Sequence, residues 1–274
     1  MLEQMIYKNH MNEVFEFGKN GIFVDSNDLH DYEWTVTKKN NRITSLDYAI
    51  SKRKLPVIII CDSEENGIAA RNKLLEVAEK DVLAMKHGQI ILGGYYFKCF
   101  ITQSQKSDYL LSKRHMKATL TLTTDFPYWV KESTFVFRKV GEDKGSTNLD
   151  FSFDYPFDYF SGMGGGSMTN SGFVGSNFRM VIYGAASNPA VYISGHEYRM
   201  NCDIAEGEYL TIDSAAKTIT LTKIDGTQVN QFMNRYRESY IFERIPAGNN
   251  HVSWEGDFGI DIILLEERSE PKWT

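Results

Sequence analysis

Apolar and polar residues alternate along several short stretches in the second half of the chain. Leu210 and Ile212 alternate with polar residues in one stretch, and Ile219 and Leu221 do so in the next. Because successive side chains of a β-strand point to opposite faces, each apolar pair can line a buried surface while its neighbours face water. The apolar run at residues 259–265 predicts one more strand near the end of the chain. The pattern predicts a small all-β domain in this half.

A helical period replaces the alternation after residue 62. Asp62 can cap the first free amides of a helix, and Glu65, three residues later, can complete a capping box. Gly88 lies where such a helix should stop. Apolar residues at helical spacing predict one buried face, formed by Ile68, Leu74, Leu75, Val77, Ala78, Val82 and Met85. The β-branched run at residues 55–61 predicts a buried strand just before the helix.

The segments after the helix predict a hairpin and then a further strand. Residues 89–92 and 95–102 flank the pair Gly93 and Gly94, which is suited to a tight turn. Residues 118–124 alternate threonine with apolar residues, which is typical of a half-buried strand. Strand, long helix, hairpin and final strand therefore make up the first half of the chain.

A polar stretch at residues 141–146 has the composition of a linker and sets the expected domain boundary between Val130 and Asp150. A chain of 274 residues is long for one core and comfortable for two. We therefore expect residues 1–136 and residues 137–274 to form separate domains. The predicted fold class is mostly β (α+β): an N-terminal β-sandwich-like domain with one long α-helix and a β-hairpin, followed by a C-terminal β-sandwich.

Charge is unevenly distributed between these halves. Of the net charge of -6, residues 1–136 contribute 18 Lys and Arg against 17 Asp and Glu, and the remainder contributes 12 against 19. An acidic second half gives no basic footprint for nucleic acid. The sequence shows no apolar run of membrane-spanning length, so no membrane partner is expected. Three widely spaced cysteines, with no Cys-x-x-Cys pair, argue against a disulfide scaffold or a zinc knuckle.

Four pieces of the last ninety or so residues, taken in order, resemble the distal tail protein (Dit) family of siphophages. They are Gly-Ala-Ala-Ser-Asn-Pro at 184–189 leading into 191–195, Leu-Thr-Ile-Asp at 210–213, Pro-Ala-Gly-Asn-Asn at 246–250, and a last apolar strand that ends near Trp273. In the first half, Phe126-Pro127-Tyr128-Trp129 lies where the family closes its N-terminal domain. Residues 42–47 lack the Pro-Gly turn that members often carry, which leaves the ring contacts unassigned.

This resemblance implies a structural virion protein and not an enzyme. The N-terminal domain would form a homohexameric ring, and the C-terminal domain would be a galectin-like sandwich that projects as a docking arm. Implied partners are the phage tail tube protein, the tail-tip protein and the receptor-binding protein, with DNA only as cargo passing through the lumen. The implied location is the tail tip of the virion, after assembly in the host cytoplasm.

Aromatic residues at every second position from 151 to 159 form the first candidate surface. Tyr155 and Tyr159 belong to this row and could stack on sugars or bases. The interpretation we favour is an inward-facing strand of the sandwich, because Asp150, Asp154 and Asp158 would repel phosphate. The alternative is a carbohydrate-binding module that contacts host cell-wall polysaccharide.

A glycine-rich stretch forms the second candidate site. Its residues are Gly162, Met163, Gly164, Gly165, Gly166 and Ser167. A phosphate-binding loop is disfavoured because no Gly-Lys-Ser/Thr and no helical period follow. The interpretation is a mobile loop that orders against a partner chain or a neighbouring subunit.

Motifs for catalysis or for a bound group are missing from the sequence. None of the six histidines is paired at metal-ligand spacing, and neither Gly-x-Ser-x-Gly nor His-Glu-x-x-His occurs. No cofactor and no metal are therefore expected. A hydrolase is the weakest alternative, since two carboxylates of a glycosidase need only be close in space.

Overall fold

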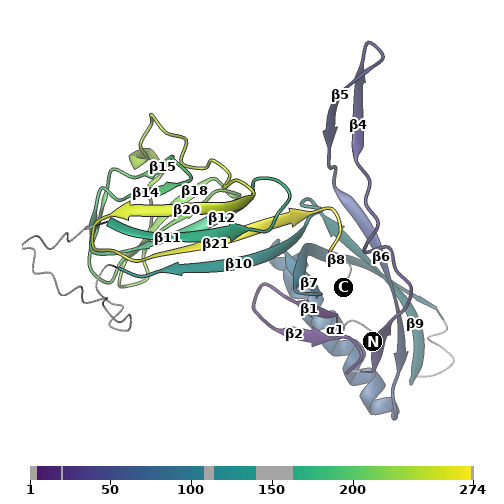
Figure 1. Cartoon of the computed structure of the whole chain (residues 1–274). Helices are drawn as coiled ribbons and strands as arrows, with labels where there is room; N and C mark the ends of the chain where they lie inside the picture. Colours follow the sequence, from purple (N-terminus) through teal and green to yellow (C-terminus); the bar gives the residue numbers. More distant parts are fainter. Residues whose placement is uncertain (1–4, 20, 108–113, 140–162, 273–274) are drawn as a thin grey trace, which may run out of the picture. The chain divides into compact units, whose positions relative to one another are not determined.

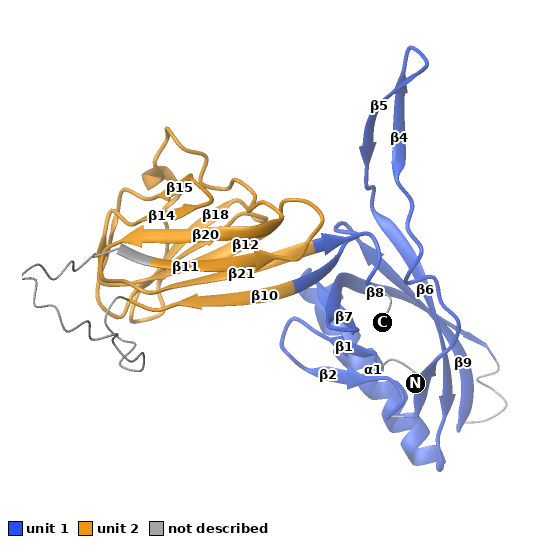
Figure 2. Cartoon of the chain, in the orientation of Figure 1, with its two compact units in different colours: residues 1–131, 267–274 blue, residues 132–266 orange. Residues whose placement is uncertain are grey.

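The computed structural model describes residues 5–19, 21–107, 114–139 and 163–272. The chain forms two compact units (Figure 2). Unit 1 consists of Met1–Lys131 with Glu267–Thr274, and unit 2 consists of Glu132–Glu266. The chain passes between the units twice, inside strand β10 (Trp129–Phe137) and inside the last strand, β21 (Ile260–Arg268).

Unit 1 is built on antiparallel strands that share one long strand, β8 (Tyr95–Ser107). The first part of β8 pairs with β7 (Gly88–Leu92) and the start of β10, and its later part pairs with β9 (His115–Thr124). The pairing continues outward through the other strands of the unit (Figure 1), namely β1 (Ile6–Lys8), β2 (Val14–Glu16), β3 (Ile22–Val24) and β6 (Ser51–Ile60). The predicted hairpin and the predicted strands at 55–61 and 118–124 are confirmed, with Gly93 and Gly94 at positive φ in the turn.

The helix α1 (Glu64–Ala84) forms where the sequence predicts it, but its ends differ from the prediction. Ser63, not Asp62, is the N-cap, and its hydroxyl accepts a hydrogen bond from the amide of Asn66 (3.1 Å). The helix ends at Met85, which adopts the left-handed conformation at φ 51°. Gly88 is instead the first residue of β7.

The buried face of α1 is also rotated relative to the prediction. Ile68 and Leu75 are 41% and 57% exposed, and Met85 is exposed as well. The residues that are buried are Gly67, Ala70, Leu74, Val77, Ala78 and Asp81. Asp81 lies on this inward face, where it accepts hydrogen bonds from the Tyr7 hydroxyl and the His10 amide. Apolar periodicity alone therefore predicted the helix correctly and part of its face wrongly.

Strands β4 (Thr35–Lys39) and β5 (Arg42–Asp47) form a separate two-stranded hairpin that stands away from the rest of unit 1 (Figure 1). Asn40 and Asn41 form its turn at φ 49° and 59°. Two consecutive residues at positive φ are what a tight hairpin turn requires, and asparagine tolerates this conformation. Apart from Ser45, every residue of the two strands is exposed. We refer to residues 35–47 as the arm.

Unit 2 is an antiparallel sandwich. One sheet has the order β19-β18-β17-β12-β21-β10 and the other the order β11-β20-β14-β15. Buried side chains of both sheets form one apolar cluster, which includes Phe178, Ile212, Tyr198 and Trp254. A short 3-10 helix, η1 (Phe232–Asn234), follows β19. Besides β10 and β21, the strands of unit 2 are β11 (Met163–Asn170), β12 (Asn177–Tyr183), β13 (Ala186–Ser187), β14 (Ala190–Ile193), β15 (His196–Arg199), β16 (Asp203–Ile204), β17 (Tyr209–Asp213), β18 (Thr218–Thr222), β19 (Gln228–Asn230) and β20 (Gly248–Glu255).

The alternation noted in the sequence determines which side chains fill this core. Leu210, Ile212, Ile219 and Leu221 are all buried, as predicted. β17 and β18 pair with Leu210 opposite Leu221 and Ile212 opposite Ile219, so the four side chains share one face. The predicted fold class, a mostly β chain with one long α-helix, is confirmed for the described residues.

Candidate functional site

The described residues contain no group of three or more His, Cys, Asp and Glu side chains that could hold a metal ion. His10 and His87 each contact a single carboxylate, that of Asp81 and that of Asp125. Burial raises the pKa of the Cys99 thiol to about 12 and that of Cys202 to about 11. Both thiols are therefore protonated at neutral pH and are poor nucleophiles. Among the described residues, the candidate functional sites are therefore surfaces that could bind a partner.

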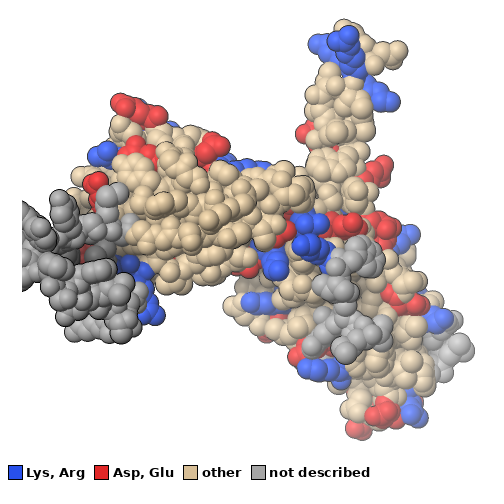
Figure 3. Space-filling view, in the orientation of Figure 1, with Lys and Arg blue, Asp and Glu red and all other residues tan. Residues whose placement is uncertain are grey.

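The first of these surfaces is the arm. Val36, Ile43 and Leu46 are 44%, 61% and 52% exposed. Val36 lies opposite Leu46 in the strand register, so the two share a face. Lys38, Lys39 and Arg42 flank the turn, and cationic side chains gather at this end (Figure 3). An exposed strand pair with apolar side chains and a basic tip is suited to contact another protein chain.

The base of the arm is fixed to unit 1 by aromatic contacts. Trp34 stacks on Tyr48 with ring centroids 4.1 Å apart, and Tyr48 meets Tyr128 edge to face at 4.9 Å. The Tyr48 hydroxyl donates a hydrogen bond to the Ser269 hydroxyl (2.5 Å). The arm thus projects from an ordered base.

The second surface is an apolar groove beside α1, which we call the helix groove. It has a volume of about 490 Å³. Leu75 and Val82 of α1 form one wall, and Ile101 of β8 with Met116 and Leu120 of β9 line the other. Leu75 was predicted to lie on the buried face of the helix. It is exposed because it lines this groove.

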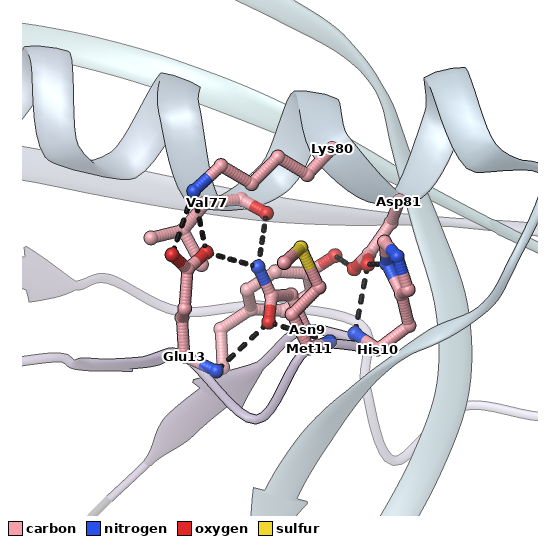
Figure 4. A network of polar contacts seen from close by, with 8 residues as sticks. Asn9, His10, Met11, Glu13, Val77, Lys80 and Asp81 are labelled. Carbon is pink, nitrogen blue, oxygen red and sulfur yellow. Dashed lines mark hydrogen bonds and ion pairs between the residues drawn. The ribbon is translucent and has the colours of Figure 1, made fainter.

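A buried polar network joins the hairpin β1–β2 to α1 (Figure 4). Asp81 of α1 is fully buried and accepts hydrogen bonds from the Tyr7 hydroxyl (2.5 Å) and the His10 amide (2.9 Å), and the His10 ring nitrogen Nδ1 lies 2.6 Å away. Burial, and then the hydrogen bond to Asp81, raise the pKa of Tyr7, which keeps its hydroxyl protonated as a donor. A β-carbon on Gly88 would collide with Asp81 Oδ2 and with the Tyr7 hydroxyl. Gly88 is therefore needed beside the network.

Asn9 extends the network toward solvent. Its side-chain amide donates to Glu13 (2.7 Å) and to the carbonyl of Val77 (3.2 Å). Lys80 on the outer side of α1 bonds Glu13 at 2.6 and 2.8 Å. The network positions the first hairpin of the chain on the helix whose other side forms a wall of the helix groove.

The structure corrects the prediction for the glycine-rich stretch. Met163, Gly164, Gly165, Gly166 and Ser167 lie in strand β11, which pairs with β20 along its whole length. This stretch is therefore a strand and not a loop. The hydrogen bonds between strands are made by backbone groups, so residues without side chains can form them. At Gly166 a β-carbon would lie 2.7 Å from the ring of Phe137, so the absence of a side chain makes room for that ring.

The remaining residues of the two predicted sites are not placed. Tyr155, Tyr159 and Gly162 lie outside the described residues. Binding of a partner by the glycine-rich stretch, and stacking by the two tyrosines, stay predictions.

A third surface, which was not predicted from the sequence, is a hollow of about 570 Å³ on unit 2. Lys217, Phe232 and residues 235–242 form its lining. The Lys217 ammonium lies 5.5 Å from the Tyr240 ring centroid and 5.3 Å from that of Phe242, and the Arg235 guanidinium lies 4.0 Å from that of Phe232. These are cation–π distances. The available signal was the mixture of cations and aromatics in Arg-Tyr-Arg-Glu-Ser-Tyr at 235–240.

Comparisons with known proteins show which solved structures have a similar fold. The chain is similar to the crystal structure of the SPP1 Dit protein, described as a paradigm of the hub adsorption apparatus in phages that infect Gram-positive bacteria, with 10% identity and a TM-score of 0.61 over 98% of this chain and 100% of that one. It is similar to chains of the phage p2 baseplate in its activated conformation with Ca and with Sr, at 11% and 12% identity, each with a TM-score of 0.64 over 99% of this chain and 100% of the other.

No family model and no curated protein matches the sequence. The resemblance to the Dit family predicted from the sequence is confirmed as a likeness of fold that extends over nearly the whole chain. No α-helix of the described residues is long and apolar enough to cross a membrane.

Proposed function

We propose that this chain is a structural hub protein of a phage tail, six copies of which close into a ring. The ring joins the tail tube protein to the tail-tip protein and to the receptor-binding protein. The observation that carries the proposal is the fold, which matches proteins named as a phage hub and as baseplate components over nearly the whole chain and the full length of each neighbour. The likeness covers both units, and the hub role is inferred by analogy with those proteins, because a fold by itself does not determine function.

Two unlike surfaces of unit 1 support self-association. The arm presents Val36, Ile43 and Leu46, and the helix groove presents an apolar concave surface. A closed ring needs a head-to-tail contact between two different surfaces of each copy, and such a contact leaves no free interface once the ring is complete. In this proposal the arm of one copy contacts the next copy, and the helix groove is the candidate acceptor.

The two halves of the chain have different roles in this proposal. Residues 1–136 form the ring, and residues 137–274 form a galectin-like sandwich that holds other virion components. The protein resides in the tail tip of the virion after assembly in the host cytoplasm. DNA passes through the lumen of the ring only as cargo, and the role involves no catalysis.

Replacing Ile43 by aspartate tests the role of the arm. A carboxylate at this exposed apolar position leaves unit 1 folded, because Ile43 contributes little to a core. At an interface, however, the charge must be desolvated without a partner, so we expect at least a hundredfold weaker self-association. The measurement is the assembled fraction against protein concentration, by analytical ultracentrifugation.

The matched control is Ile224→Asp, the same substitution at a residue that is 76% exposed on unit 2. This variant is expected to assemble as the unmodified chain does. Equal loss of assembly in both variants, or loss in neither, argues against the arm as the ring contact.

A further inference from the structure

The hollow on unit 2 is cationic, although the half of the chain that contains it is acidic. From residue 137 onward the chain has 12 Lys and Arg against 19 Asp and Glu. In the hollow, Lys217, Arg235 and Arg237 are present with one acidic residue, Glu238. A local excess of positive charge in a concave site attracts an anionic ligand.

The segment that lines the hollow is held in place by hydrogen bonds to β15. The Tyr236 amide donates to the carbonyl of Arg199 (3.1 Å), and the Ser239 hydroxyl donates to the carbonyl of Glu197. His196 Nε2 donates to the carbonyl of Tyr240 (2.9 Å). The lining is therefore ordered before any ligand arrives, which reduces the entropy lost on binding.

Lys217 is positioned independently, by the turn between β17 and β18. Asp213 accepts hydrogen bonds from the amides of Ala215 (3.0 Å) and Ala216 (2.8 Å) through one carboxylate oxygen. Lys217 follows in the left-handed conformation at φ 57°. A turn fixed in this way directs the Lys217 side chain over the rings of Tyr240 and Phe242.

We propose that this hollow binds a phosphate-bearing saccharide. Its phosphate pairs with Lys217, Arg235 and Arg237, and its sugar ring rests on the Tyr240 side chain, which is 54% exposed. The volume of about 570 Å³ lies within the range of small-ligand sites. Aromatic side chains offer a flat apolar face beside a polar tip, which suits the C–H face and hydroxyls of a sugar.

A saccharide fits the hollow better than an acidic peptide does. Peptides are commonly bound along a free strand edge or a long groove. Apart from Lys217, every residue that lines the hollow belongs to the single segment 232–242. The site is thus compact, with charge and aromatic surface side by side. This site is separate from the proposed ring contacts, so its test does not depend on ring formation.

The experiment is a titration of the full chain, followed by ligand-observed NMR, with three probes: N-acetylglucosamine 1-phosphate, N-acetylglucosamine and inorganic phosphate. We expect the sugar phosphate to bind at least tenfold more tightly than either of the other two. Lys217→Gln and Tyr240→Ala are each expected to weaken its binding at least fivefold. Added NaCl should weaken it as well, because the charged groups lie at the surface.

Lys223→Gln and Tyr209→Ala serve as matched controls, since both residues are exposed on unit 2 and neither lines the hollow. Circular dichroism is used to check that all four variants are folded. The proposal is overturned if the sugar phosphate does not bind, if phosphate alone binds equally well, or if the controls lose as much affinity as the test variants. Equally tight binding of an aspartate-rich hexapeptide overturns it in favour of a protein partner.

Discussion

Replacing Asp81 by alanine is expected to lower the free energy of unfolding by about 4 kcal/mol, because it leaves buried donors without an acceptor. The Tyr7 hydroxyl and the His10 amide both donate to this carboxylate, and Tyr7 and Asp81 are fully buried. Each hydrogen bond to a charged group contributes about 1.5–3 kcal/mol, and an unpaired buried donor adds a desolvation cost. Urea unfolding followed by circular dichroism measures the change.

Lys80→Ala is the matched control, one residue away on the same helix. Lys80 is an exposed partner of Glu13, and because water screens an ion pair of this kind, its loss is expected to cost far less stability than the loss of Asp81. Tyr7→Phe, which removes one donor and leaves Asp81 in place, should fall between the two at about 2 kcal/mol. Similar losses for Asp81→Ala and Lys80→Ala would mean that the buried network is not what holds the first hairpin on α1.

Replacing Trp254 by alanine is expected to destabilise unit 2 by about 4 kcal/mol. Trp254 lies on β20, is 2% exposed, and pairs in register with Gly164 of β11 and Val191 of β14. Its ring meets that of Phe137 edge to face with centroids 5.9 Å apart, and its indole N–H donates to the carbonyl of Phe258 (3.0 Å). Alanine leaves a cavity between the two sheets and an unpaired carbonyl.

Trp254→Phe separates the two contributions, since phenylalanine keeps most of the volume and loses the hydrogen bond. It should lose about 2 kcal/mol. Tyr240→Ala, a comparable truncation at a half-exposed position, should cost less than about 1 kcal/mol. The measurement is again urea unfolding, and a loss below about 1 kcal/mol for Trp254→Ala would contradict the assigned place of this side chain in the core.

The parts of the fold that the sequence predicts are those in which one face of an element is buried. Residues 118–124 and 209–213 alternate because one side of each strand packs on a core and the other faces water. Helix α1 was predicted from its apolar periodicity, but its N-cap is Ser63 and not Asp62, and its buried face was predicted only in part. Burial of Asp81 depends on Tyr7 and His10, which lie some seventy residues earlier, so local periodicity could not reveal it.

The strands of the arm and strand β11 were not predicted from the sequence, for two different reasons. The arm is exposed on both faces, so its strands carry no apolar alternation, and the Asn40-Asn41 turn was the signal that remained. Strand β11 begins with Met163 and three glycines, and its pairing with β20 is made by backbone groups. The hollow on unit 2 required the turn after β17 to bring Lys217 beside the segment 232–242, an encounter set by tertiary structure.

Ring formation can be followed through the mass of the purified full chain in solution, measured by light scattering across a range of concentrations. The chain has a mass of 31.4 kDa, so a closed hexamer has a mass of about 188 kDa. If six copies close into a ring, the larger species forms as the concentration rises, and Ile43→Asp shifts the mass back toward 31.4 kDa. A single mass of 31.4 kDa that persists at the highest concentration would contradict ring formation.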